Sequence, residues 1–418
     1  MKFGVFYEHQ LPRPWTESSE YDLLQNSLEQ IALADRLGYD YAWEVEHHFT
    51  EEYSHSSAPE VFLAAASQRT SRIRLGHGVI QLPTNHIARV AERVATLDLI
   101  SRGRVELGTG EGSTTTEIHP FNIRFRDKRE IYEESIRALI PMFTTQGSEF
   151  HGQHIDFPLR NVIPKPMQKP HPPLWVACSN INTIEMAGQR GMGALGFQFV
   201  SPEAAAAWVN CYYRNFTTKL SKLADYATNP NIAMVCGFMC AQTDELAMER
   251  ASGWTFFIFA LQYYSKYGYS EPGKLNMWDK YQEWRQTPKA QEALHTGLIG
   301  SPETIRKKLR DYERTNVDQV ILLNQSGKTR HEDICSSLEL FAREVMPEFH
   351  EREPAHQAWK ADVLSGKTQI ADLDTAPFQK YLGQPDEHAA QSMSATELKQ
   401  KLDARDLERA ANETKQRN

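Results

Sequence analysis

Hydrophobic residues recur along this chain in two patterns that alternate. Eight short runs rich in β-branched, aromatic and other apolar residues predict buried strands, at residues 2–7, 40–46, 73–82, 104–110, 173–179, 193–200, 231–241 and 317–323. Between them lie longer stretches with apolar residues three or four positions apart, as in 23–38 and 87–101, which predict amphipathic helices. Eightfold alternation of strand and helix favours a parallel sheet closed as a (β/α)8 barrel of the TIM type over an open doubly wound sheet.

Two segments interrupt this alternation. Residues 261–300, between the seventh and eighth strands, are rich in Tyr and Trp and contain Gly and Pro interruptions. A connection this long predicts either a lid over an active site or a helical pair that packs on the barrel or on a neighbouring subunit. Residues 351–418 are poor in aliphatic side chains, which predicts a helical or partly disordered extension. We therefore expect a barrel domain over 1–350, with the insertion inside it, and a polar C-terminal extension.

Composition limits which partners and which cellular compartment are expected. The 46 basic and 54 acidic side chains give a net charge of −8 and are spread along the sequence, so nucleic acid is not the expected partner. Five cysteines without framework spacing predict reduced thiols in a cytoplasmic protein. No stretch approaches the roughly 18 apolar residues of a membrane span, and the N-terminal residues show no small-residue cleavage site. We expect neither membrane insertion nor secretion.

Three polar stretches follow predicted strands, where a barrel of this kind places its active site. They are "EHHFTEEYSHSS" (46–57) after the second strand, "HGVIQLPTNH" (77–86) at the third, and "GTGEGSTTTEIHPF" (108–121) at the fourth. Because the carboxyl ends of parallel barrel strands meet at one mouth, these stretches are expected to converge there. Each stretch alone would be a weak indication of function.

The adjacent histidines His47 and His48 invite comparison with a metal site. On an extended chain neighbouring side chains point to opposite sides, so both histidines cannot easily bind one ion, and no metal is expected. A metal-dependent barrel hydrolase is therefore a remote alternative. Two interpretations remain open: one histidine is hydrogen-bonded within the wall and the other lies on the surface, or one acts as a donor or acid–base group in a pocket, since imidazole titrates near neutral pH.

Glycine-rich stretches and a helix start complete the candidate site. The run Gly108–Gly112 lacks the spacing of a dinucleotide-binding fingerprint, and it permits either close approach of a flat ligand or a plain tight turn. Gly78 lies inside a strand pattern, which indicates a bulge, a strained peptide or the close approach of a ligand. Ser179 and Asn180 precede a helix and suit either an anion such as phosphate or ordinary helix capping.

In this order, these stretches resemble the bacterial luciferase-like family of flavin-dependent monooxygenases. The resemblance extends over residues 1–347 and is most specific over 46–112. It implies a (β/α)8 barrel that binds flavin at its C-terminal mouth. It also implies that a separate NAD(P)H:flavin reductase supplies reduced FMN, which reacts with O2 through a flavin hydroperoxide to oxygenate a small apolar or heterocyclic compound.

The resemblance also assigns residues by position. It makes Glu46, His47 and His48 the catalytic group, with His47 the histidine tied to catalysis. It places an unusual non-prolyl cis peptide at Gly78–Val79, and its implied cofactor-binding residues are Gly78, Val79, His86, Gly108, Gly110, Ser179 and Asn180. Luciferase has a cysteine and then a phosphate-binding arginine where this chain has Gly110 and Glu111. A carboxylate repels phosphate, so phosphate binding must be rearranged, and light emission is not expected.

Other functions fit the same sequence. A hydride-transferring oxidoreductase that uses a reduced deazaflavin would share the fold without needing oxygen. A non-catalytic flavin-binding protein is a second alternative, although the intact Glu46-His47-His48 group speaks against it. We also expect a homo-oligomer, a dimer or higher.

Overall fold

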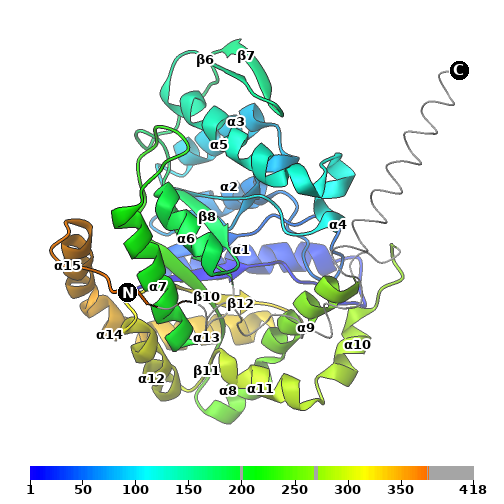
Figure 1. Ribbon diagram of the computed structural model, residues 1–418. Helices are drawn as coiled ribbons and strands as arrows, with labels where there is room; N and C mark the ends of the chain where they lie inside the picture. Colours follow the sequence, from blue (N-terminus) through cyan, green and yellow to red (C-terminus); the bar gives the residue numbers. More distant parts are fainter. Residues whose placement is uncertain (198–200, 268–271, 374, 376–418) are drawn as a thin grey trace, which may run out of the picture.

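A closed parallel barrel forms the body of the chain (Figure 1). The computed structural model describes residues 1–197, 201–267, 272–373 and 375. Neighbouring strands pair in chain order, and pairing of β9 with β10 closes the barrel. Its strands are β1 (Lys2–Tyr7), β2 (Tyr41–Glu44), β3 (Arg74–His77), β5 (Val105–Gly110), β8 (Leu174–Cys178), β9 (Gly193–Gly196), β10 (Ile232–Cys240) and β12 (Gln319–Gln325). The predicted barrel is confirmed, and each predicted strand overlaps one of these; residues 198–200 of the sixth lie outside the described residues.

Helices follow the strands and pack around the outside of the barrel (Figure 1). The surrounding helices are α1 (Ser19–Leu37), α2 (Pro59–Arg69), α3 (Ile87–Ile100), α5 (Lys128–Thr144), α6 (Ile181–Arg190), α7 (Pro202–Thr218), α12 (Pro302–Glu313) and α13 (His331–Glu344). Their buried residues recur at helical spacing, as at Val90, Ala91 and Val94 of α3, so each helix covers the barrel with one apolar stripe.

Two indole rings fill the barrel interior. Trp43 of β2 and Trp175 of β8 are buried, and their ring centroids lie 5.4 Å apart at 82°. Neighbouring strands make room for them with glycine: a Cβ at Gly76 would lie 2.2 Å from the Trp43 ring, and one at Gly193 would lie 2.4 Å from Trp175. The barrel interior is therefore a packed core, which leaves no room for a ligand between these two rings.

The predicted insertion lies between the seventh and eighth barrel strands. The whole connection between β10 and β12 comprises α8 (Asp244–Arg250), α9 (Ser252–Tyr267), α10 (Met277–Trp284), α11 (Pro288–Thr296) and β11 (Leu298–Gly300), and the predicted insertion 261–300 begins within α9. The strand β11, which pairs in parallel with β10, was not predicted because three residues are too few to show a strand period. The predicted place of the insertion is confirmed, although residues 268–271 lie outside the described residues.

A second addition is an antiparallel hairpin between α5 and β8. Its strands are β6 (Ser148–His151) and β7 (Asp156–Arg160), and it projects from the barrel above α3 and α5 in Figure 1. Most of its residues are exposed, so its sequence carries no alternation of apolar and polar positions. For this reason the hydrophobic pattern did not predict it.

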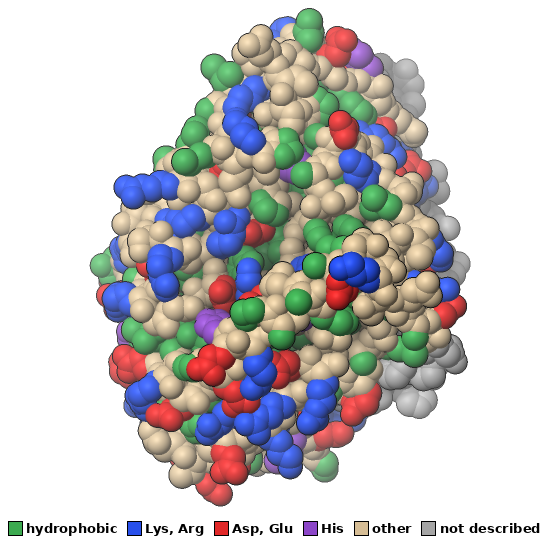
Figure 2. All heavy atoms as spheres, turned by 90° about the vertical axis from the view of Figure 1, so that its left-hand side faces the viewer, with side chains coloured by type: hydrophobic (Ala, Val, Ile, Leu, Met, Phe, Trp, Pro, Cys, Tyr) green, Lys and Arg blue, Asp and Glu red, His purple; other side chains and the backbone are tan. Residues whose placement is uncertain are grey.

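The C-terminal part packs at the opposite end from the mouth. After α14 (Met346–Glu351), α15 (Glu353–Leu364) contributes Lys360, whose Nζ lies 3.0 Å from Oδ1 of the buried Asp318, and His356, whose Nε2 lies 2.8 Å from the same oxygen. Figure 2 shows this face, where acidic and basic side chains are intermingled. The extension beyond 375 lies outside the described residues. Within the described part of the chain, no helix is long and apolar enough to cross a bilayer.

Candidate active site

Two histidines at the mouth of the barrel point to different carboxylates. Glu46, His47 and His48 directly follow Val45, which extends β2. His47 Nδ1 donates to Glu117 Oε1 at 2.7 Å, whereas His48 Nε2 donates to Glu46 Oε1 at 2.9 Å. The two rings therefore hydrogen-bond to different carboxylates, as expected for adjacent side chains that point to opposite sides of an extended chain.

Both ring nitrogens of His47 face carboxylates. On the side away from Glu117, His47 Nε2 lies 3.5 Å from Oε2 of Glu8, the first residue after β1. Burial of the ring lowers the pKa of His47, but the negative charges of Glu117 and Glu8 outweigh it and raise the pKa to about 9. His47 is therefore protonated at neutral pH and presents an N–H at each nitrogen.

Several hydrogen-bond donors stabilise the negative charge of Glu117. Besides His47, its carboxylate accepts hydrogen bonds from Gln81 Nε2 at 3.0 Å and Thr114 Oγ1 at 2.9 Å. Burial raises the pKa of Glu117, but His47 and these two side chains lower it to about 2. Gln81 also donates from its backbone N to Glu46 Oε2 at 2.9 Å, so it connects the two carboxylates.

The peptide bond between Gly78 and Val79 is cis, as the resemblance implies, and this geometry is confirmed. The neighbouring strand β5 packs directly against this segment. A Cβ at Gly108 would lie 1.9 Å from the His77 carbonyl oxygen, and one at Gly110 would lie 2.6 Å from Val79 Cγ2. Packing within the protein therefore requires glycine at both positions, whether or not a flavin lies nearby. Their role in cofactor binding stays a prediction.

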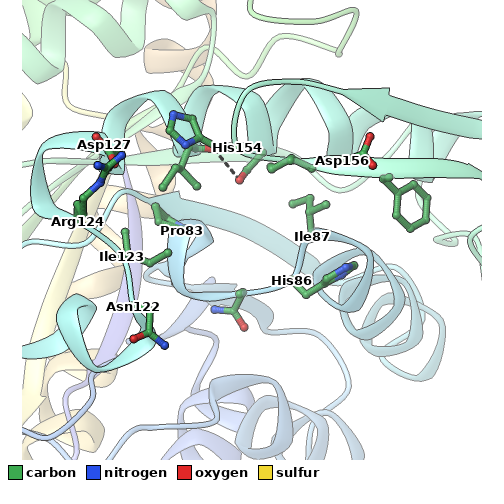
Figure 3. Close-up of a pocket in the computed structure, with 14 residues that line it drawn as sticks. Pro83, His86, Ile87, Asn122, Ile123, Arg124, Asp127, His154 and Asp156 are labelled. Atoms are coloured by element: carbon green, nitrogen blue, oxygen red, sulfur yellow. Dashed lines mark hydrogen bonds and ion pairs between the residues drawn. The ribbon is translucent and has the colours of Figure 1, made fainter. Parts of the chain in front are cut away.

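His86 lies apart from the strand-two histidines. It is exposed and lines a hollow of about 430 Å³ together with Asn122, Arg124, His154 and Asp156 (Figure 3). None of Glu46, His47 and His48 lines this hollow. The link between the two places is Asn85, which lines the hollow and donates from Nδ2 to Glu46 Oε1 at 3.0 Å.

Ser179 and Asn180 stand at the N-terminus of α6, next to the end of β5. Asn180 Oδ1 accepts from the Thr183 backbone N at 3.0 Å, and Thr183 Oγ1 accepts from the Asn180 backbone N at 3.1 Å. This reciprocal capping box accounts for Asn180 structurally. Ser179 is exposed, and its part in anion binding remains a prediction.

Glu111 is paired with two cations from the start of α5. Its Oε1 lies 3.1 Å from an Arg129 guanidinium nitrogen and 3.6 Å from Lys128 Nζ. Lys128 also donates to the Gly112 carbonyl oxygen at 2.6 Å. The carboxylate that replaces an arginine is thus surrounded by two positive charges, and the end of β5 carries a net positive group rather than an isolated negative one.

Aromatic side chains close one side of the mouth. The Tyr53 ring lies 5.3 Å from the His47 ring, 5.9 Å from Phe257 of α9 and 5.9 Å from Tyr264 of the same helix. Because Phe257 and Tyr264 belong to the helix that begins the insertion, this part of the insertion covers His47 from the side.

Glu52 fastens the insertion to the loop after β2. Its buried carboxylate accepts hydrogen bonds from the backbone N–H groups of Met277 at 2.5 Å, Trp278 at 3.1 Å and Arg13 at 2.9 Å. The N-terminal end of α10 therefore packs on the stretch 46–57, so this stretch is not merely a solvated loop.

Glu8 and Glu117 were not recognised as site residues in the sequence. A signal existed for each. Glu8 is the first residue after a barrel strand, where catalytic groups are usual, and Thr114 and Glu117 have the spacing of a capping box. Neither signal reveals that both carboxylates meet one histidine, because Glu117 is 70 residues from His47 along the chain.

Comparison with known proteins identifies the family of the chain. Residues 1–319 match the model of the luciferase-like monooxygenases. The chain is 26% identical over 372 residues to the oxygenase component of the flavin-dependent trigonelline monooxygenase of Acinetobacter baylyi. The matched region covers 84% of this chain and 96% of that relative. Its matches to the first curated relatives span only about half the length of those proteins.

Solved structures of low sequence identity share the fold. The oxygenating constituent of 3,6-diketocamphane monooxygenase from Pseudomonas putida, in complex with FMN, has a TM-score of 0.68 at 20% identity, covering 83% of this chain and 98% of that one. The coenzyme F420 dependent tetrahydromethanopterin reductase of Methanopyrus kandleri has a TM-score of 0.59 at 20% identity, covering 83% and 99%. Since the family model covers more than half of its length, the chain belongs to the luciferase-like monooxygenase family.

Proposed function

We propose that this protein is a flavin-dependent monooxygenase that uses reduced FMN and O2 to oxygenate a small apolar or heterocyclic compound. The observation that carries the proposal is His47, held protonated between Glu117 and Glu8, in a chain that contains the cis Gly78–Val79 peptide and belongs to the luciferase-like monooxygenase family. We further propose that a separate NAD(P)H:flavin reductase supplies the FMN, that the protein is cytoplasmic, and that it forms a dimer or higher oligomer.

The side chains at the mouth fit a bound flavin. Val79 and Phe197 are half-buried, and the Phe197 ring centroid lies 5.7 Å from that of the buried Phe6, so Val79 and Phe197 offer apolar surface to a flat ring. Lys128 and Arg129 provide cations for the phosphate that Glu111 alone would repel. When bound, reduced FMN supplies the electrons that activate dioxygen.

In this proposal His47 is the proton donor of the site. Glu117 fixes the ring through Nδ1 and keeps it charged, which leaves the Nε2 proton available to an oxygen atom of the reacting group. General acid catalysis of this kind contributes roughly 10²–10⁴-fold in rate. The rings of Tyr53, Phe257 and Tyr264 limit the access of water from the side of the insertion, which protects reactive oxygen chemistry from side reactions.

The phosphate assignment can be tested by comparing two flavins. We expect the wild-type chain to bind FMN more tightly than riboflavin, which lacks the phosphate. Lys128→Ala and Arg129→Ala should each reduce this preference, because each removes one positive charge beside Glu111. Arg126→Ala is the matched control, since its guanidinium is exposed and pairs with Asp127 instead. An unchanged preference in both variants would contradict the assignment.

Product analysis tests the activity itself. The chain would be incubated with FMN, NADH, a flavin reductase and a panel of small heterocyclic and terpenoid compounds under ¹⁸O2. We expect at least one compound to gain a single labelled oxygen atom, detected by mass spectrometry. Turnover of a compound without oxygen, supported by a reduced deazaflavin, would instead favour the hydride-transfer alternative.

A further inference from the structure

Glu8 is a buried carboxyl group beside His47, and its own proton has no role in the proposed activity. It follows β1 at the mouth, and its side chain is 5% exposed. Its Oε1 accepts from the Tyr53 hydroxyl at 3.3 Å. Its Oε2 is buried and has no hydrogen-bond partner among the described residues, and it lies 3.5 Å from His47 Nε2. A buried carboxyl oxygen that accepts no hydrogen bond lowers the stability of the folded state, so its presence here calls for a functional reason.

The surroundings of Glu8 contain one cation. Tyr53, in the loop after β2 and backed by Tyr264 of α9, donates to the carboxyl group, while Glu44 of β2 and Glu117 of α4 (Thr115–Ile118) repel its negative charge. Among the groups with the largest influence on the pKa of Glu8, His47 is the one that carries a positive charge. Negative charge on Glu8 is therefore stabilised mainly by the proton on His47.

We propose that Glu8 is a positioning residue that acts through His47, by holding a proton on Oε2 and returning it to His47 Nε2 after that nitrogen has donated its own. In this step the Oε2–H bond breaks and an Nε2–H bond forms, so the imidazolium is restored and Glu8 is left as a carboxylate. Glu8 then regains a proton from water, and no electrons are transferred. The inference deepens the proposed function, because it rests on His47 as the proton donor.

The protonation states support this order of events. Burial, the largest influence, raises the pKa of Glu8 to about 7, although His47 and Tyr53 lower it. Glu117 has a pKa of about 2 and His47 of about 9. Near neutral pH, Glu8 is thus the member of the group Glu8, His47 and Glu117 whose protonated and ionised forms are both well populated, which suits a proton reservoir.

Nuclear magnetic resonance of the histidine rings tests the proposal without flavin. The full chain would be labelled on histidine, and the His47 signal would be assigned with His47→Gln. In the wild type we expect the His47 signal to respond to pH twice, near 7 when Glu8 ionises and near 9 when His47 itself loses its proton. Glu8→Gln should remove the lower step and reduce the His47 pKa by about one unit or more, because a negative charge at this distance favours the imidazolium.

Two further variants separate proton sharing from packing. Glu8→Asp keeps a carboxyl group and should retain the lower step, whereas a purely structural role would not distinguish Asp from Gln in this signal. Glu20→Gln removes a carboxylate that pairs with another histidine, His55, at 2.9 Å, so it should alter only the His55 signal. A His47 titration that is the same in Glu8→Gln and wild type would overturn the proposal.

The outcome is independent of whether the activity is correct. If Glu8→Gln changes the His47 titration but reduced FMN does not bind, proton sharing stands and the proposed function fails. If FMN binds and oxygenation proceeds but the His47 titration is unchanged, the function stands and the role of Glu8 fails. Where both hold, Glu8→Gln should also lower kcat near neutral pH with little change in KM, and Glu8→Asp should partly restore kcat.

Discussion

Glu117→Gln is the substitution that most directly perturbs the charge of His47. Glutamine has the same shape and can still contact Thr114 and Gln81, but it cannot carry the negative charge that faces His47 Nδ1 at 2.7 Å. The substitution therefore removes one electrostatic interaction with little change in packing. We expect His47 to become neutral near physiological pH and the folded protein to lose stability.

The magnitude follows from the two pKa values. Despite the opposing effect of burial, the carboxylates raise the pKa of His47 from 6.5 to about 9, and His47 holds the pKa of Glu117 at about 2 rather than 4.5 despite burial. Each change of about 2.5 on the pH scale corresponds to about 3 kcal/mol. Both values describe the same interaction and are not added, and Glu8 contributes to the first. Glu117→Gln should therefore lower the free energy of unfolding by about 2–3 kcal/mol where the pair is fully charged.

The loss should depend on pH in a defined direction. Because the folded pKa of His47 is raised, its contribution is complete below pH 6.5 and disappears as pH rises through 9. Because the folded pKa of Glu117 is lowered, its contribution is complete above pH 4.5 and disappears as pH falls through 2. The difference between wild type and Glu117→Gln should be largest near pH 5.5 and should shrink by pH 9.5.

Urea unfolding followed by tryptophan fluorescence measures this difference, since Trp43 and Trp175 lie in the barrel core. Glu20→Gln is the control: its carboxylate is 71% exposed and pairs with His55, so its loss should cost less than about 1 kcal/mol at either pH. Equal destabilisation by Glu117→Gln at pH 5.5 and pH 9.5, or no destabilisation, would refute the reasoning.

Three other predictions concern neighbouring features. His47→Ala should retain flavin binding but lose oxygenation, as measured by flavin fluorescence titration and product formation; unchanged turnover would remove His47 from its role. Gly108→Ala should lower the free energy of unfolding by about 1–3 kcal/mol or more, because its Cβ would meet the His77 carbonyl oxygen. Gly78→Ala should cost less, because its Cβ would meet no atom nearer than 3.5 Å. Thermal unfolding that ranks the two variants in the reverse order would contradict this. Glu52→Gln should loosen the insertion, so limited proteolysis near residues 272–278 should become faster than in wild type.

The barrel was predictable because its strands are buried on both faces. Each such strand reads as a short apolar run, and the run 231–241 predicts β10 (Ile232–Cys240) almost to the residue. The hairpin of β6 and β7 was not predictable in this way, since its exposed residues need no hydrophobic period. Secondary structure that buries little leaves little trace in the hydrophobic pattern.

Some residues of the candidate site were likewise predictable from the sequence, and others were not. His47 and His48 stood out because charged and titratable residues cluster after a strand, and the resemblance added the cis peptide at Gly78–Val79. Glu8 did not stand out, because a lone carboxylate after a strand has no local pattern, and its burial and its contact with His47 arise only when β1 and β2 pair. Pairing of distant groups is a property of the closed barrel rather than of any one stretch.

Glu111 shows why a substitution read alone can mislead. As a single residue it predicts repulsion of a phosphate, because the resemblance aligns this carboxylate with an arginine of luciferase. In the folded chain it contacts Lys128 and Arg129, which lie 17 and 18 positions later at the start of α5. The charge at the end of β5 is therefore set by the helix that follows it.

The most direct test of the proposed function is the reaction of the bound flavin with oxygen. The chain would be titrated anaerobically with reduced FMN and then mixed rapidly with oxygenated buffer while absorbance is recorded. We predict tight binding of reduced FMN, followed by a transient absorbance band that free reduced FMN does not show under the same conditions. Direct reoxidation at the rate of free flavin, together with tight binding of a reduced deazaflavin, would contradict the monooxygenase proposal.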